Sequence, residues 1–269
     1  MNARRMKKNR SEFMYELYAL LAVILVIQGF YTAVVRPRAV AILAAQQAAM
    51  AKDPEYVPER TLWVIAKDYE QEVCVILSLW AVIVMALRAR TATRARRLLD
   101  RDLLHLPEGM RVLPEDSREY LRQLEGVDEH TRGMLLPRAL FTALERFGAT
   151  RSVQDASAAA RNTCQMENER LDSELAMVRF VAWAIPALGF VGTVRGIGES
   201  LQQAHRAIEG DVSGVTAGLG VSFNATLIAL TLSIVVMFFL HQLQLLQERL
   251  VLDTENYVDE RLLRHLHVR

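Results

Sequence analysis

The sequence predicts an all-α membrane protein with four transmembrane helices, a helical cytoplasmic insertion between spans two and three, and a helical C-terminal tail. Of the 269 residues, 52% are hydrophobic and 23% are charged, and the two classes are segregated along the chain. Four stretches carry no Asp, Glu, Lys or Arg: 17–35, 73–87, 180–194 and 212–247. A bilayer core about 30 Å thick needs about 20 helical residues. The two shorter stretches reach that length if charged residues at their ends snorkel to the interface.

The density of lysine and arginine predicts the orientation of the spans. Five basic residues lie in the first ten positions and six lie in 88–101. The 37-residue segment 36–72 also carries five basic residues, but they are interspersed with six acidic ones. The positive-inside rule therefore places both termini in the cytoplasm. The predicted segments are a basic cytoplasmic N-terminus (1–12), spans at 13–35, 73–87, 175–208 and 212–240, an extracytoplasmic loop (36–72), a cytoplasmic helical domain (88–174) and a cytoplasmic helical tail (241–269).

The cytoplasmic insertion contains helix start and stop signals. Pro137 opens an amphipathic stretch, and Gly148 is expected to end it. Ser152 and Asp155 have the spacing of a capping box. Because no glycine or proline follows before Pro186, we expect one long helix that continues from the cytoplasm into the third span.

Small residues recur in the last two spans. In the third span, Gly189, Gly192 and Gly196 follow Pro186 at steps of three or four residues. Lipid provides no hydrophobic drive for helix packing, and such stripes let two helices approach closely. We therefore predict that these residues and Gly218 pack the two spans together. The stripe in the fourth span consists of Gly218, Ser222, Thr226, Ala229 and Ser233.

Two threonines are predicted to lie at one depth in this hairpin. Thr193 lies 17 residues before Gly210, in the connecting turn, and Thr226 lies 16 residues after it. At about 1.5 Å per residue, both hydroxyls lie about 25 Å from the turn. One interpretation is a narrow polar ion path lined by Thr193, Thr226, Ser222 and Ser233. The alternative is that the hydroxyls bond backbone carbonyls of their own helix and the glycines only pack.

The interior of the hairpin contains no titratable side chain of its own. Asn224 and Thr231 are possible polar accessories in the fourth span, and Glu199 lies near the outer end of the third. Glu16, in the first span, is expected to be interfacial. A proton path needs a titratable group, so we expect a partner protein to supply the acid.

Two stretches resemble the MotA/TolQ/ExbB family of ring-forming subunits in ion-driven motors. They are PALGFVGTVRGI at 186–197 and VSFNATL at 221–227. The resemblance covers about residues 175–250, and the four-span plan is similar to MotA. It implies a homopentamer around a dimer of a single-span MotB/TolR/ExbD-like partner in a bacterial inner membrane. The partner's membrane aspartate would carry H⁺ or Na⁺ and face the threonines at Thr193 and Thr226.

Enzyme chemistry is not indicated, and we expect no catalytic residue, metal site or cofactor beyond the transported ion. The glycines of 192–198 lack the Gly-Lys-Ser/Thr of a phosphate loop. His265 and His267 are two positions apart, so on a helix they point in different directions. A net charge of +1 gives no basis for nucleic-acid binding.

Three functional hypotheses follow from the sequence. The first is a motor subunit that couples the flow of H⁺ or Na⁺ past a partner aspartate to mechanical work. The second is a non-conducting scaffold that organises cytoplasmic partners, and the third is a self-contained channel or transporter that uses Glu199 or Glu16. The arginines of 88–101 also suit contact with a cytoplasmic rotor or effector. The ion and the driven process (flagellar rotation, envelope energisation, defence or gliding) stay open.

Overall fold

The chain is an all-α membrane protein, as predicted. A computed structural model describes residues 2–53, 56, 59, 61–104 and 110–268, with side chains described from residue 14 onward. Of the described residues, 84% are helical, and four of the helices that they form are long and apolar enough to cross a membrane. The side chains of the basic N-terminal residues, which the sequence places in the cytoplasm, lie outside this description.

The chain divides into two compact units, which are described separately. The first unit comprises Met1–Met85 and Met177–Leu240, and the second comprises Ala86–Ala176 and His241–Arg269. Helices α4 and α11 contribute residues to both units. Helical elements with residues in the first unit are α1 (Asn2–Phe30), the π-helical turn η1 (Tyr31–Val35), α2 (Arg36–Lys52), α3 (Leu62–Ile65), α4 (Tyr69–Arg96), α9 (Ala176–Gln202), α10 (Ala204–Ile208) and α11 (Ser213–Arg261).

The first span continues as a helix into the segment that the sequence treats as an outer loop. Helix α1 leads through the π turn into α2, where the Arg36 N–H bonds to the Tyr31 carbonyl. Pro37 follows at the start of α2 and has no N–H, so the regular hydrogen-bond ladder cannot continue through it. The wider π turn accommodates this break. The candidate span Met14–Lys52 has 39 residues, about 58 Å of helix, and is therefore longer than a bilayer core.

Helix α4 is tied to the first span by two polar contacts. The Trp80 indole N–H donates to the Glu16 carbonyl at 3.0 Å. In the first turn of α4, Glu72 forms an ion pair with Arg36 at 2.5 Å, and the Glu72 side chain is only 3% exposed. These contacts hold α4 against α1 and α2.

The second unit is built around a helical core. Phe147, Leu140 and Leu144 of α7 are completely buried, together with Cys164 of α8 and Leu262 after α11. An isolated parallel bridge also joins Val112 to Leu266. The unit's remaining helices are α5 (Ser117–Glu125), α6 (Glu129–Arg132), α7 (Leu135–Thr150), α8 (Val153–Glu174) and the 3₁₀ helix η2 (Leu263–His265).

The helix signals in this unit were partly correct. The capping prediction is confirmed, because the Ser152 hydroxyl accepts a hydrogen bond from the Asp155 N–H at 3.2 Å. The expectation that Gly148 ends its helix was wrong, because α7 runs on to Thr150. Gly148 instead permits a close approach, since a Cβ there would lie 2.5 Å from the Ser117 hydroxyl.

The long helix expected from the cytoplasm into the third span is divided. Helix α8 ends at Glu174 and α9 begins at Ala176. Between them, the Leu175 N–H bonds to the carbonyls of Asp172 and Ser173 instead of the residue four positions earlier. The tightened turn is local and needs neither glycine nor proline, which is why the sequence pattern does not reveal it.

Candidate functional site

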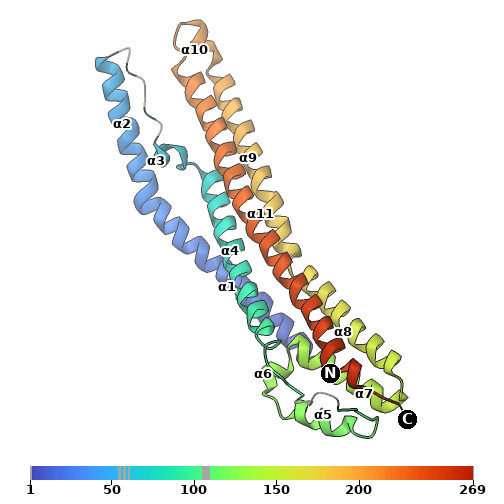
Figure 1. The fold of residues 1–269 in the computed structure, drawn as a ribbon. Helices are drawn as coiled ribbons and strands as arrows, with labels where there is room; N and C mark the ends of the chain where they lie inside the picture. The colour runs from blue at the N-terminus through green and yellow to red at the C-terminus, as the bar shows by residue number, and fades with distance from the viewer. Residues whose placement is uncertain (1, 54–55, 57–58, 60, 105–109, 269) are drawn as a thin grey trace. The chain divides into compact units, whose positions relative to one another are not determined.

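The candidate site lies in a helical hairpin formed by α9 and α11. The two helices lie side by side and are joined at α10 (Figure 1). Gly210 turns the chain with φ of +98°. Asp211 then caps α11, because its carboxylate accepts the Ser213 N–H at 3.0 Å and the Ser213 hydroxyl. These two hydrogen bonds lower the pKa of the Asp211 carboxyl.

Glycines allow the two helices of the hairpin to approach closely. A Cβ on Gly189 would lie 2.6 Å from the Ala229 Cβ, and one on Gly192 would lie 2.5 Å from the Ala225 Cβ. At Gly196 a Cβ would collide with the Ser222 hydroxyl and also with backbone, since it would lie 2.7 Å from the Gly218 carbonyl oxygen. Of the residues that the sequence assigned to packing, the four glycines therefore lie in the α9–α11 interface.

Thr193 and Thr226 meet across this interface. Their hydroxyls form a hydrogen bond with each other, so the equal depth predicted from residue counting is present in the structure. The Gly189 carbonyl lies 3.1 Å from the Thr193 hydroxyl and 3.4 Å from the Thr226 hydroxyl. Each hydroxyl has one hydrogen and two acceptor lone pairs. The pair therefore has enough hydrogens to bond internally and to Gly189, and keeps acceptor capacity for a ligand.

The two serines of the stripe face the interface and are buried within the chain. The Ser222 hydroxyl lies 3.1 Å from both the Thr193 carbonyl and the Gly218 carbonyl, and Ser222 is 2% exposed. The Ser233 hydroxyl donates to the Ala182 carbonyl at 3.2 Å. Both serines thus bond to backbone, and the half-buried threonines are the more accessible hydroxyls.

The accessory residues are more dispersed. Asn224 is half-buried, whereas Thr231 is exposed and its hydroxyl bonds to the Leu227 carbonyl of its own helix at 2.8 Å. The Glu199 carboxylate pairs with Arg195 at 2.7 Å. Of these three residues, only Glu199 is part of a charged cluster.

Glu70 is a residue that the sequence reasoning did not select. Its carboxylate accepts two hydrogen bonds from the Arg195 guanidinium, at 2.6 and 2.9 Å. Its stem packs on α9, because a Cβ on Gly192 would lie 3.4 Å from the Glu70 Cγ. The one sequence feature that could have pointed to this pair is position: Glu70 lies just before one charge-free stretch, and Arg195 lies just after another. Position along the chain does not indicate, however, that these two residues, which are 125 positions apart, contact each other.

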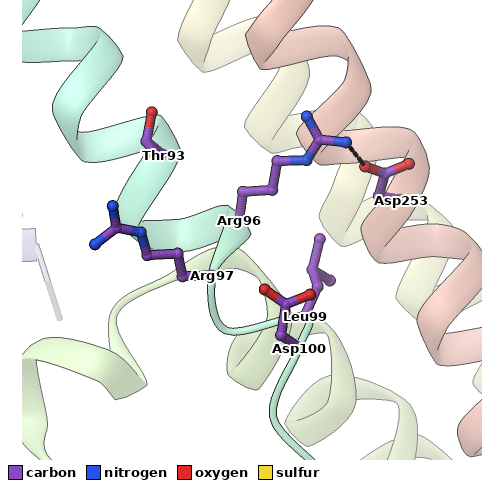
Figure 2. A pocket seen from close by; sticks show the side chains of 6 residues that line it. All are labelled: Thr93, Arg96, Arg97, Leu99, Asp100 and Asp253. Atoms are coloured by element: carbon purple, nitrogen blue, oxygen red, sulfur yellow. Dashed lines mark ion pairs between the residues drawn. The ribbon is translucent and has the colours of Figure 1, made fainter.

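A hollow of about 300 Å³ lies in the second unit (Figure 2). Arg96 forms an ion pair with Asp253 at 3.0 Å, while Arg97 extends away from that pair. These arginines belong to the basic segment for which the sequence suggests a cytoplasmic partner, and that role stays a prediction. The lining residues are Thr93, Arg96, Arg97, Leu99, Asp100 and Asp253.

Fold and site together define a polytopic helical membrane protein whose last two spans form a tightly packed hairpin with a hydroxyl pair. Residues 134–256 match the sequence model of the MotA/TolQ/ExbB proton channel family. The match extends from α7 to most of α11, and the resemblance seen in the sequence is confirmed over this region. Members of the family work in oligomeric complexes with partner proteins. No curated protein and no solved structure shows a significant match to the chain.

Proposed function

We propose that this chain is the ring-forming subunit of an ion-driven motor, in which H⁺ or Na⁺ flows past a partner's aspartate and drives mechanical work. The observation that carries the proposal is the Thr193–Thr226 hydroxyl pair inside the region that matches the proton channel family. The charge-free parts of α9 and α11 around the pair contain no carboxylate. A titratable carrier therefore has to come from another chain.

The hydroxyl pair suits a carboxyl group that alternates between charged and neutral forms. A charged carboxylate is expensive in an apolar surrounding, and protonation lowers that cost. The threonine oxygens accept a hydrogen bond from the protonated carboxyl or coordinate a sodium ion. To donate to the charged carboxylate, the hydroxyl that bonds to Gly189 rotates and exchanges that bond for one to the carboxylate. The pair thereby lowers the free energy of the partner's acid at this depth.

Exposed apolar faces support an assembly in the membrane. On α11, Phe223 is 64% exposed and Ile234 is 71% exposed, and Phe190 on α9 is 60% exposed. Such faces suit lipid, neighbouring copies and a partner helix. We propose a homopentamer around a dimer of a single-span MotB/TolR/ExbD-like protein, in a bacterial inner membrane. The basic residues near the N-terminus and after position 88 favour cytoplasmic termini.

The pairing of Glu199 disfavours a self-contained channel that uses Glu199 as its carrier; a channel that uses Glu16 stays an alternative. Its carboxylate is held by Arg195, and a carboxylate paired in this way is a poor carrier because protonation would forfeit the ion pair. Flux from the purified chain alone that is lost in Glu199→Gln would instead support the self-contained channel.

The proposal predicts that Thr226→Val reduces ion flux about tenfold or more, because the carrier loses one hydrogen-bonding group. The measurement is H⁺ or Na⁺ uptake into liposomes that contain this chain and the product of its neighbouring gene. Thr226→Ser keeps the hydroxyl and should keep most of the flux. Thr231→Val removes an exposed hydroxyl from the same helix and should change nothing.

Undiminished flux in Thr226→Val, with unchanged assembly, would contradict the assigned role. No flux in the wild-type complex would favour a non-conducting scaffold.

A further inference from the structure

Three charged side chains meet where α4 begins and the charge-free part of α9 ends. Arg195 donates from Nε to Glu70 Oε1 at 2.6 Å and from Nη2 to Glu70 Oε2 at 2.9 Å. Its Nη1 donates to Glu199 at 2.7 Å. The exposed fractions of the side chains are 13% for Glu70, 38% for Arg195 and 47% for Glu199. Two carboxylates and one guanidinium leave this cluster with one net negative charge.

The cluster lies near the level of the threonine pair but is displaced from it around the circumference of α9. Arg195 follows Thr193 by two residues, which is a rise of about 3 Å and a rotation of about 200°. Glu70 packs on Gly192, the residue before Thr193. Because a helix is about 10 Å across, the charged cluster and the threonine hydroxyls are separated by about that distance.

Without its carboxylate partners, the positive charge of Arg195 would repel a cation at the threonine hydroxyls. At about 10 Å in a partly buried surrounding, one unit charge changes the local cation concentration by about tenfold. Glu70 cancels the positive charge with two hydrogen bonds. Glu199 then makes the sum negative, although its greater exposure means that water screens it more.

We propose that Glu70 determines cation access to the Thr193–Thr226 pair by neutralising Arg195 from the neighbouring helix. The inference rests on the proposed function, because it requires a cation to move past the threonines. It adds a residue that lies outside the α9–α11 hairpin and outside the family-matched region 134–256.

The test compares Glu70→Gln, Arg195→Gln and the double variant, each as the full chain with its neighbouring-gene partner in liposomes. A potassium diffusion potential drives uptake, and dyes report H⁺ and Na⁺. Glu70→Gln should reduce flux about tenfold at low cation concentration, since it removes one negative charge and leaves only the more exposed Glu199 to oppose the guanidinium. Arg195→Gln should conduct at least as well as wild type, and the double variant should return to within about threefold of it.

A purely structural role gives a different pattern. Glu70→Gln and Arg195→Gln both disrupt the two hydrogen bonds between α4 and α9, so a structural role predicts equal losses. Glu199→Gln is the matched control: it removes one negative charge from the same cluster but leaves the two bonds to Glu70, and its effect should be much smaller. Size-exclusion chromatography checks that each variant assembles.

The outcomes separate this inference from the proposed function. Wild-type flux in Glu70→Gln, or equal losses in both single variants, would overturn the inference alone. Absence of flux in wild type would overturn the proposed function and the inference with it. If Glu70→Gln does not assemble, the other two variants decide, and loss of flux in Arg195→Gln overturns the inference.

Discussion

Pro186 in the third span explains a hydrogen bond made by Ser233 in the fourth. Proline has no N–H, so the Ala182 carbonyl, four residues earlier in α9, lacks the partner that a regular helix provides. The Ser233 hydroxyl of α11 donates to this carbonyl at 3.2 Å, and both residues are buried. In a membrane, neighbouring helices commonly satisfy carbonyls freed by proline. The proline thus explains why the serine hydroxyl bonds to this carbonyl, and the predicted role of Ser233 in an ion path stays a prediction.

This contact predicts a coupling between the two positions. Ser233→Ala should destabilise the protein by about 1–2 kcal/mol, because the Ala182 carbonyl loses its partner in a buried site. Pro186→Ala restores an N–H, so the serine substitution should cost less in that background. Thermal unfolding of the wild type, the two single variants and the double variant in detergent measures this double-mutant cycle. An equal cost of Ser233→Ala in both backgrounds would show that the serine does not compensate for the proline.

At the scale of elements, the hairpin depends on how closely α9 and α11 approach. Gly196 faces backbone atoms of α11, and these cannot move away as the end of a flexible side chain can. Gly198, two residues later in the same helix, would place a Cβ in open space. The two glycines therefore provide a matched pair for testing the interface.

Gly196→Ala should lower stability by about 1–3 kcal/mol, because an added methyl in a closely packed interface forces the helices apart. Gly198→Ala should be neutral or slightly stabilising, since alanine is the better helix former and meets no neighbour. Thermal unfolding in detergent measures both effects. Similar unfolding temperatures for the two variants would mean that close approach at Gly196 contributes little.

The elements also show how far sequence patterns reach. Counting residues from Gly210 correctly predicts that Thr193 and Thr226 lie at the same level of the hairpin, because the rise per residue is constant in both helices. The π turn before Pro37 and the break at Leu175 were not predicted. Each is a change in one or two hydrogen bonds, and side-chain periodicity does not report such changes.

At the scale of the whole molecule, the chain combines a membrane unit with a second helical unit that has its own buried core. The family match begins in α7 of the second unit and includes the threonine hairpin of the first. Both units therefore contribute to the region on which the proposed function rests.

The proposed assembly predicts a pentamer of this chain around a dimer of a single-span partner. Native mass spectrometry of the detergent-solubilised complex, expressed with the neighbouring gene, measures the copy numbers. Thr226→Val should give the same copy numbers as wild type, because it changes a hydroxyl pair within one chain. A monomer or an even-numbered assembly without the partner would contradict the motor subunit.

The sequence by itself determined the helical class, the four spans, the family and the depth of the threonine pair. These properties follow from local quantities: the length of charge-free stretches, a short motif and the constant rise of a helix. Only the tertiary structure decided that Arg195 pairs with Glu70 and that Ser233 pairs with the Ala182 carbonyl. Which side chains meet across two helices depends on their rotation and contact distance, and local patterns constrain neither strongly enough.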